Sequence, residues 1–386
     1  MLFSLAVYLG TAALMAWLGW HVGQREQRLM AQGGGELPFL SWEILAAISV
    51  YVLVSALRWQ TSWDYNMYYS NYMAMQSLGQ YSRENFEPGF DLITIAMARA
   101  GLHYAFYFAF WAAFHIILLY YALRHRKILL PWVAICLLIG PMYLQWMNAI
   151  RQAVVECLML VMVELIVKRK FWLYLALSLV AMLIHRISVL LIPLYFVPLI
   201  PMRGGVKRMV PFVVLLVIVA LGFFPQWIQW CFERIGYLAS LLGYGHYYRL
   251  FTSNDAEYVF WTVMGPTRLF PILSIGIIIW YYPSIKRFFN GDPYLAAIYR
   301  LSLVYIAYVN LFASTTLYLR RPGELLRGVF LVMISYALCY LWRERRWVPF
   351  AAMVFLNLYY IFYEMIKASV NMSSVLAPEL YHTFLF

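Results

Sequence analysis

Long runs of apolar residues, separated by short polar or charged clusters, follow one another along most of the chain. A helix that crosses the core of a bilayer needs about 20 consecutive apolar residues. Ten runs approach or reach that length, over residues 2–20, 39–57, 103–123, 128–146, 149–167, 209–229, 262–282, 294–313, 325–342 and 347–367. The pattern predicts an all-α, polytopic integral membrane protein, in which residues 1–386 form one transmembrane domain of about 10 to 12 transmembrane helices.

The composition supports a membrane protein and excludes a water-soluble enzyme. Of 386 residues, 64% are hydrophobic and 12% are charged, whereas a soluble domain is about half apolar and about a quarter charged. The first run lacks a basic start and a small-residue cleavage site, so we expect it to remain as a helix rather than to be removed as a signal peptide. The four cysteines show no spacing typical of disulfides or metal ligands, and we expect no metal or other cofactor.

The formal net charge of +12 would suggest nucleic acid in a soluble protein. In a membrane protein, excess cations instead mark the cytoplasmic loops, so we expect no nucleic-acid partner. Five basic clusters are expected in the cytoplasm: Arg124, Arg126 and Lys127; Lys168, Arg169 and Lys170; Arg203, Lys207 and Arg208; Lys286 and Arg287; Arg343, Arg345 and Arg346. The outer side then receives residues 58–101, 230–261 and 314–324.

The segment 171–201 has basic residues at both ends. One full crossing would put the second basic cluster outside, so we expect a broken or re-entrant helical hairpin with arms 171–184 and 187–200 and a turn near His185. Non-helical backbone at membrane depth lines protein or a water-filled cavity. A lone buried histidine is more often a packing residue than a catalyst, but at such a turn His185 would suit general base catalysis.

The outer segment 58–101 is rich in aromatic rings and also carries carboxylates. Asp64, Tyr68 and Tyr72 recur at i, i+4 and i+8, which places them along one face of a helix. Flat rings with nearby hydroxyls and carboxylates, including Glu87, suit the binding of sugars. The alternative is an interfacial aromatic belt, which we expect to account for at least half of these rings.

Three arginines stand at the expected outer end of a helix, against the positive-inside rule. Arg320 and Arg321 precede Pro322-Gly323-Glu324, and Arg327 follows. We interpret Pro322 and Glu324 as an N-terminal helical turn, where free amides and the helix dipole attract anions. Guanidinium groups bind phosphate in a bidentate manner, so these arginines, with Arg268 adding to the same field, predict an outward clamp for a lipid-linked phosphate or pyrophosphate. The alternative is binding of ordinary lipid headgroups.

Arg151 opens an apolar helix within the string Asn148-Ala149-Ile150-Arg151-Gln152. Ionisable residues in membrane helices are costly and invite a functional explanation. The equally plain alternative is an interfacial arginine whose head reaches out to the headgroups. Glu156 lies too far round the helix to pair with Arg151 directly, so we expect its partner to lie elsewhere.

Several motifs in a fixed order resemble the EpsG family, whose members are Wzy-type polymerases of exopolysaccharide and O-antigen. The motifs are Phe86-Glu87-Pro88-Gly89-Phe90, then Asn148-Ala149-Ile150-Arg151-Gln152, then an apolar run that ends in His185, with Asp64, Tyr68 and Tyr72 upstream. The resemblance implies a GT-C-like glycosyltransferase in the bacterial cytoplasmic (inner) membrane, with its active site facing the periplasm. It also implies a lipid-linked oligosaccharide substrate carried on undecaprenyl pyrophosphate, and a chain-length regulator as a further partner.

Taken together, these expectations describe a polymerase that transfers a glycan from its lipid pyrophosphate to a hydroxyl of the next repeat unit. The alternatives are an O-antigen ligase and a transporter or flippase of the lipid-linked oligosaccharide. His185, or failing that Asp64 or Glu87, would accept the hydroxyl proton, and Arg151 would stabilise the leaving group. The substrate-binding candidates are Arg320, Arg321, Arg327, Gln152, Asn148, Tyr68, Tyr72 and Arg268.

Overall fold

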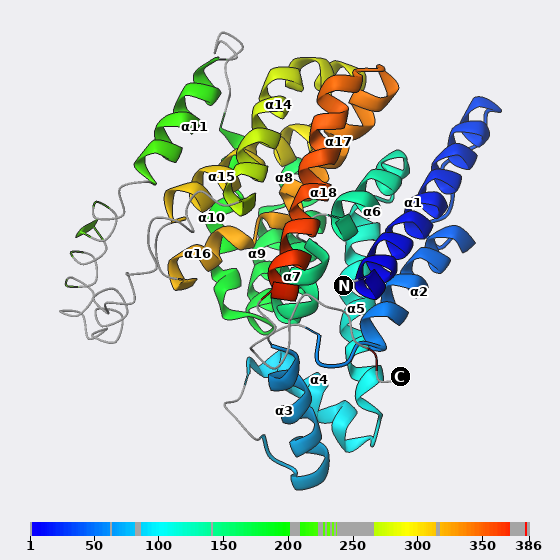
Figure 1. Ribbon diagram of the computed structural model, residues 1–386, viewed down its shortest axis with the longest axis vertical. Helices are drawn as coiled ribbons and strands as arrows, with labels where there is room; N and C mark the ends of the chain where they lie inside the picture. Colours follow the sequence, from blue (N-terminus) through cyan, green and yellow to red (C-terminus); the bar gives the residue numbers. More distant parts are fainter. Residues whose placement is uncertain are drawn as a thin grey trace.

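A computed structural model describes residues 2–61, 64–81, 86–139, 142–200, 209–222, 266–313 and 317–370, with a few isolated positions between 227 and 237 and at Thr383. These residues form helices and no β-sheet, which confirms the all-α prediction for the described part of the chain (Figure 1). The α-helices are α1 (Leu2–Ala31), α2 (Trp42–Ala56), α3 (Tyr65–Leu78), α4 (Pro88–Arg99), α5 (Tyr104–Ala122), α6 (Leu130–Ile139), α7 (Met142–Asn148), α8 (Ile150–Val167), α9 (Phe171–Met182), α10 (Leu191–Leu194), α11 (Met209–Leu221), α14 (Pro266–Phe288), α15 (Pro293–Leu311), α16 (Leu317–Glu324), α17 (Arg327–Arg343) and α18 (Trp347–Val370). Short 3₁₀ helices are η1 (Lys127–Leu129), η2 (Arg186–Leu190) and η3 (Val197–Leu199).

Four helices among the described residues are long and apolar enough to cross a bilayer: α1, α5, most of α14, and α15. A fifth span is formed if α6 and α7, which meet at a bend of 69°, count as one broken crossing. The chain is therefore a helical, multi-pass membrane protein. The other expected crossings coincide with helices that are shorter or more charged; α8, for example, carries Arg151, Glu156 and Glu164. The full number of crossings stays a prediction.

Helices α8 and α17 lie at the centre of the bundle, and most of their residues are buried. They approach each other closely at Gly328, where an added Cβ would lie 3.4 Å from the Glu156 carbonyl oxygen. Small residues at such contacts let membrane helices pack closely. The charged residues of α8 are thus held inside protein rather than against lipid.

The expected cytoplasmic end of the bundle is joined by ion pairs. Arg126 donates to both oxygens of Asp292, at 2.7 and 3.0 Å, and lies 3.4 Å from Glu164. Lys127, which is 1% exposed, pairs with Glu26 at 2.6 Å. Asp292 also caps α15 by accepting from the Tyr294 N–H, while Pro293 occupies the first turn, where its missing N–H costs nothing. These contacts tie the loops before α6 and α15 to α1 and α8.

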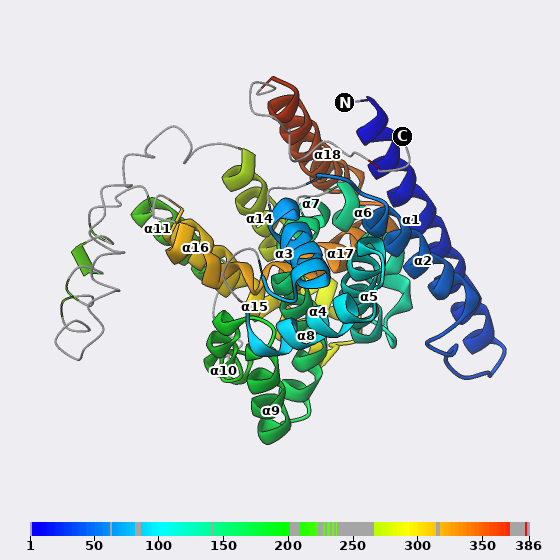
Figure 2. The same cartoon turned by 90° about the horizontal axis from the view of Figure 1, so that it is seen from below.

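At the opposite end, the expected outer loop 58–101 contains two helices, α3 and α4, which lie side by side beyond the bundle (Figure 1). Figure 2 shows them over the middle of the bundle. Tyr65, Tyr68 and Tyr72 are at most 2% exposed and pack with Phe90 and Trp111 in a small core of their own. The ring of Tyr72, which the sequence suggested for a sugar platform, fills the core between α3 and the start of α5, and its role in substrate binding stays a prediction.

Helix α9 ends at Met182, and Leu183–His185 are non-helical. The chain then turns back along α9 as η2, α10 and η3, so the second arm of the expected hairpin is three short pieces rather than one helix. The Leu183 carbonyl oxygen accepts from the N–H groups of Gly89 and Phe90, at 2.8 and 3.1 Å. The first turn of α4 thus supplies hydrogen-bond donors to a non-helical carbonyl group, which lipid could not do.

A polar cavity where the outer helices meet the bundle

A cavity of about 280 Å³ lies between α3 and the membrane helices. Its wall is contributed by the start of α3, the junction of α7 and α8, the break after α9, and α16. The lining residues are Asp64, Tyr68, Gln145, Asn148, Ala149, Arg151, Gln152, His185, Arg321 and Glu324. Segments up to 260 positions apart in the sequence, from Asp64 to Glu324, therefore present charged and polar groups to one space.

Asp64 and Asn148 hold the outer helices to the bundle on one side of the cavity. The Asp64 N–H donates to Asn148 Oδ1 at 2.9 Å, and Asn148 Nδ2 donates to Asp64 Oδ2 at 3.4 Å. Burial raises the pKa of the Asp64 carboxyl, although the positive charges of Arg321 and Arg151 oppose that rise. The carboxyl therefore faces the cavity in a place where its charged form is less favoured than in water.

On the other side, Glu87 joins Arg151 to His185. Arg151 Nη1 donates to Glu87 Oε2, and His185 Nδ1 lies 3.2 Å from Glu87 Oε1. The Arg186 N–H donates to the same Oε1 atom at 3.1 Å. Burial favours the neutral carboxyl, but the His185 hydrogen bond, the Arg151 charge and the Arg186 amide outweigh it and lower the pKa of Glu87 to about 2. Glu87 is thus an anion shared by an arginine and a histidine.

The Phe86–Phe90 string explains how Glu87 reaches this position. Glu87 is the N-cap of α4, and Pro88 takes the first helical position. An added Cβ on Gly89 would lie 2.8 Å from both the Leu183 Cβ and its carbonyl oxygen, so a glycine lets α4 touch the break. Phe90 stacks on Trp111 with ring centroids 4.5 Å apart, and this contact packs α4 against α5.

The contact with Glu87 also sets the tautomer of His185. Because the Glu87 carboxylate can only accept, Nδ1 carries the hydrogen of a neutral ring, and Nε2 keeps its lone pair. His185 lines the cavity and its side chain is 17% exposed. The geometry therefore leaves a proton-accepting nitrogen on a ring that a buried carboxylate orients.

Gln152 links the cavity to the interior of the bundle. Its Nε2 donates to Glu156 Oε1 at 3.0 Å and to Glu324 Oε2 at 3.2 Å. Trp146 Nε1 donates to Glu156 Oε2 at 2.9 Å. The hydrogen-bond partners of Glu156 are thus the Trp146 indole and the Gln152 amide. Arg151 is not among them, as its spacing from Glu156 along the helix had suggested.

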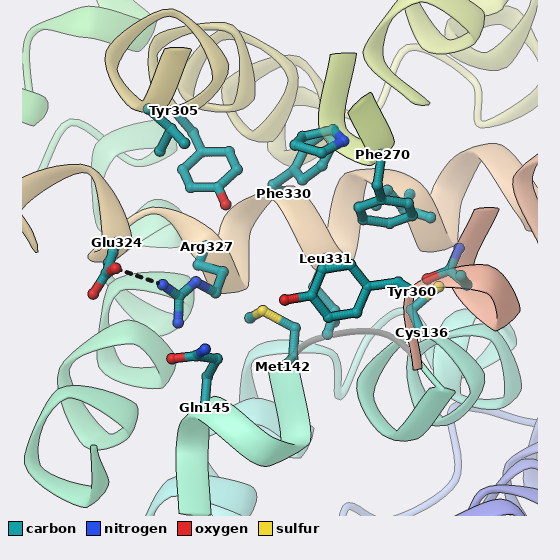
Figure 3. A pocket seen from close by; sticks show the side chains of 14 residues that line it. Cys136, Met142, Gln145, Phe270, Tyr305, Glu324, Arg327, Phe330, Leu331 and Tyr360 are labelled. Carbon is teal, nitrogen blue, oxygen red and sulfur yellow. Dashed lines mark ion pairs between the residues drawn. The ribbon is translucent and has the colours of Figure 1, made fainter. Parts of the chain in front are cut away.

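The three predicted clamp arginines are arranged differently from our expectation. Pro322 lies within α16 rather than at a helix start, and a new helix, α17, begins at Arg327. Arg321 lines the cavity, whereas Arg327 pairs with Glu324 at 3.0 Å and lines an adjoining cavity (Figure 3). The side chain of Arg320 lies outside the described part of the structure. One predicted cluster is therefore divided between two neighbouring cavities.

Three further predicted residues do not line the polar cavity. Tyr72 donates to the Leu102 carbonyl oxygen at 2.7 Å. Arg268 is buried and donates to Asn310 Oδ1 at 3.1 Å and to the Val219 carbonyl oxygen at 2.9 Å, so it joins helices α11, α14 and α15. Glu87 contacts Arg151 and His185 but does not itself line the cavity.

Gln145 and Glu324 line both cavities, but the sequence did not mark either as a binding residue. Among the described residues, no group of three or more His, Cys, Asp or Glu side chains is placed to hold a metal ion. What the cavity offers is guanidinium groups for an anion, a proton-accepting histidine, and carboxyl and amide groups for hydroxyls.

The structure thus defines a multi-pass helical membrane protein with a polar, charged cavity between its outer helices and its bundle. The EpsG family model matches residues 42–376, and the chain belongs to this family. No curated protein and no solved structure gives a significant match. Family membership makes the protein a membrane polysaccharide polymerase with glycosyltransferase-like activity.

Proposed function

We propose that the protein joins oligosaccharide repeat units, carried on undecaprenyl pyrophosphate, at the periplasmic face of the bacterial inner membrane. The observation that carries this proposal is the meeting of Arg151, Arg321 and His185 in one cavity. The first two supply charge for a pyrophosphate, and the third supplies a base. The donor is already activated, so the reaction needs no nucleotide.

In the proposed reaction, a hydroxyl oxygen of the incoming repeat unit attacks the anomeric carbon of the growing glycan. The bond between that carbon and the pyrophosphate oxygen breaks, and the electron pair leaves with undecaprenyl pyrophosphate. The hydroxyl proton passes to His185 Nε2. Arg151 and Arg321 stabilise the charge that develops on the leaving oxygen, and such preorganised stabilisation is commonly the largest contribution to catalysis.

Glu87 is a positioning residue in this scheme. It holds a low pKa and accepts from Arg151, His185 and the Arg186 amide, so it is poorly suited to taking a further proton. Asp64 lines the cavity and has a raised pKa, and we assign it to binding the acceptor hydroxyl beside His185. Asn148, Gln152 and Tyr68 line the same wall and are proposed to contact the sugars.

The proposal includes a topology and partners. The basic end of the bundle, near Arg126 and Arg343, lies in the cytoplasm, and α3 and α4 lie in the periplasm. Ten to twelve crossings in a GT-C-like arrangement would place the cavity at the outer boundary of the bilayer. Besides the lipid-linked oligosaccharide and membrane lipids, a chain-length regulator is the expected protein partner.

The test uses purified full-length protein and a lipid-linked repeat unit, with products separated by size on a gel. Wild type is expected to produce a ladder of polymer. His185→Ala and Arg151→Ala should each reduce the rate about 100-fold or more, whereas His21→Ala and Arg99→Ala, which alter exposed residues outside the cavity, should not.

A ladder of normal length from His185→Ala or Arg151→Ala would contradict the corresponding role. In cells, loss of the protein should leave single repeat units attached to their final acceptor. Accumulation of free lipid-linked polymer would instead indicate an O-antigen ligase. Accumulation of unpolymerised units on the cytoplasmic side, with no polymerisation by the purified protein, would indicate a transporter.

A further inference from the structure

A second cavity, of about 160 Å³, adjoins the polar cavity and shares Gln145 and Glu324 with it. Its remaining walls come from the membrane helices α6, α7, α14, α15, α17 and α18. It extends away from the outer helices α3 and α4, neither of which contributes a lining residue. Nothing in the proposed reaction uses this space.

One face of α17 gives this cavity a gradient from charged to apolar. Arg327, Phe330, Leu331 and Ile334 recur at i, i+3, i+4 and i+7, which is one side of a helix. From Arg327 to Ile334 the helix advances about 10 Å. The guanidinium group therefore stands nearest the polar cavity, and three large apolar side chains follow it along the same wall.

The opposite wall follows the same order (Figure 3). Gln145, Glu324 and the hydroxyl of Tyr305 lie around the guanidinium of Arg327, while the rings of Phe270 and Tyr360 lie further along, with the Tyr360 hydroxyl toward the cavity. Asn357 is a polar residue of the lining that is 2% exposed; its Nδ2 donates to the Met353 carbonyl oxygen at 2.8 Å, while its Oδ1 has no hydrogen-bond partner among the described residues. The cavity thus has a charged mouth, beyond which the apolar side chains of α17 and Phe270 lie beside the polar groups of Asn357 and Tyr360.

We propose that this cavity binds the first isoprene units of the polyprenyl carrier, with Arg327 at the junction between the lipid chain and its pyrophosphate. The inference rests on the proposed function, because it takes the pyrophosphate to lie in the polar cavity. A polyprenyl pyrophosphate has a charged head followed directly by a branched hydrocarbon, which matches the order of side chains along α17. Burial of those isoprene units contributes binding free energy in proportion to the apolar area removed from water.

The test measures binding rather than turnover. Full-length protein in detergent is mixed with farnesyl pyrophosphate that carries a diazirine on its first isoprene unit, and is then illuminated. Mass spectrometry is expected to locate the adduct on lining residues of α17, α14 or α18. An excess of unlabelled undecaprenyl pyrophosphate should compete. Labelling confined to exposed membrane faces, such as α1, would overturn the proposal.

Two variants sharpen this test. Leu331→Trp fills the cavity and is expected to weaken labelling about tenfold or more, since it excludes several methylene groups. Leu14→Trp makes the same change at a residue that is 42% exposed on α1 and should leave labelling unchanged. Asn357→Leu is the smaller change: labelling should be kept or increased for a hydrocarbon occupant. A several-fold loss in Asn357→Leu would indicate a polar occupant and would contradict the proposal.

A phospholipid with a diazirine in its acyl chain separates the isoprenoid from ordinary membrane lipid. Equal labelling of the cavity by this phospholipid would overturn the assignment to the carrier. The outcomes also separate the two proposals. Specific labelling by a protein that does not polymerise repeat units would contradict the polymerase reaction, whereas polymerisation with labelling elsewhere would contradict only the lipid-chain site.

Discussion

Glu87 shows how a single residue gains contacts that its neighbours in sequence do not suggest. It lies 98 positions before His185 and 64 before Arg151, yet contacts both. Its own helix needs it only as an N-cap position, and its side chain makes no capping hydrogen bond there. The carboxylate is therefore held for the contacts it makes across the fold.

The low pKa of Glu87 predicts a dependence of stability on pH. Because the folded state lowers this pKa from 4.5 to about 2, the contacts of the carboxylate stabilise the fold fully above pH 4.5 and lose this contribution as the pH falls toward 2. The Glu87→Gln variant has no carboxylate at this position, so it has no such contribution to lose as the pH falls. We expect the thermal unfolding temperature of wild type in detergent to fall more steeply between pH 4.5 and 2 than that of Glu87→Gln; parallel curves would contradict the assignment.

The site residues that the sequence revealed are those whose chemistry conflicts with their surroundings. Arg151, Arg321 and His185 stood out as ionisable groups in or beside apolar runs, and each lines the polar cavity. Gln145 did not stand out, because an amide within a helix has no unusual charge. Tyr72 shared a helical face with Asp64, but eight residues carry it about 12 Å along the helix, beyond the cavity.

At the scale of elements, the interface between α4 and the break after α9 determines the geometry of the site. The basic clusters at both ends of the segment 171–201 predicted a turn near His185. They did not predict that α4 would dock there, because this contact depends on a hydrogen-bonded carbonyl at Leu183 and on the absence of a side chain at Gly89. The spacing of Asp64, Tyr68 and Tyr72 predicted a helix where α3 lies, but α4 was missed, since its segment was interpreted as part of an outer loop.

Gly89→Ala tests this interface. The new methyl group would meet the Leu183 Cβ and carbonyl oxygen, both 2.8 Å away, so α4 must move and carry Glu87 with it. We expect a loss of stability of about 1–3 kcal/mol and a reduced rate of polymerisation. Gly10→Ala is the matched control, because an added Cβ there meets no atom within 4 Å.

For Gly89→Ala, thermal unfolding and gel ladders are measured on the same preparations. Normal stability together with normal polymer would show that the close approach of α4 has no role in the site. If Gly89→Ala is as stable as Gly10→Ala but polymerises more slowly, the loss of activity comes from the displacement of Glu87 alone.

At the scale of the whole molecule, charge is sorted to two ends of the bundle for different reasons. At one end, Arg126 and Lys127 are neutralised by Asp292 and Glu26 and hold helices together. At the other, Arg321 and His185 face a cavity. Hydropathy and the basic clusters predicted most of the bundle helices and the two differently charged ends. They do not encode which helices lie next to each other, so the division of the predicted arginine cluster between two cavities became visible only in the fold.

The proposed orientation can be tested with cysteines at the two ends. In a variant whose four natural cysteines are replaced, Leu78→Cys places a thiol on α3, where Leu78 is 71% exposed, and Glu344→Cys places one at the exposed turn after α17. A membrane-impermeant maleimide added to intact spheroplasts should label Leu78→Cys at once and Glu344→Cys only after permeabilisation. The reverse pattern would put the cavity on the cytoplasmic side, where repeat units are assembled rather than polymerised, and the polymerase reaction proposed here would lack its substrate.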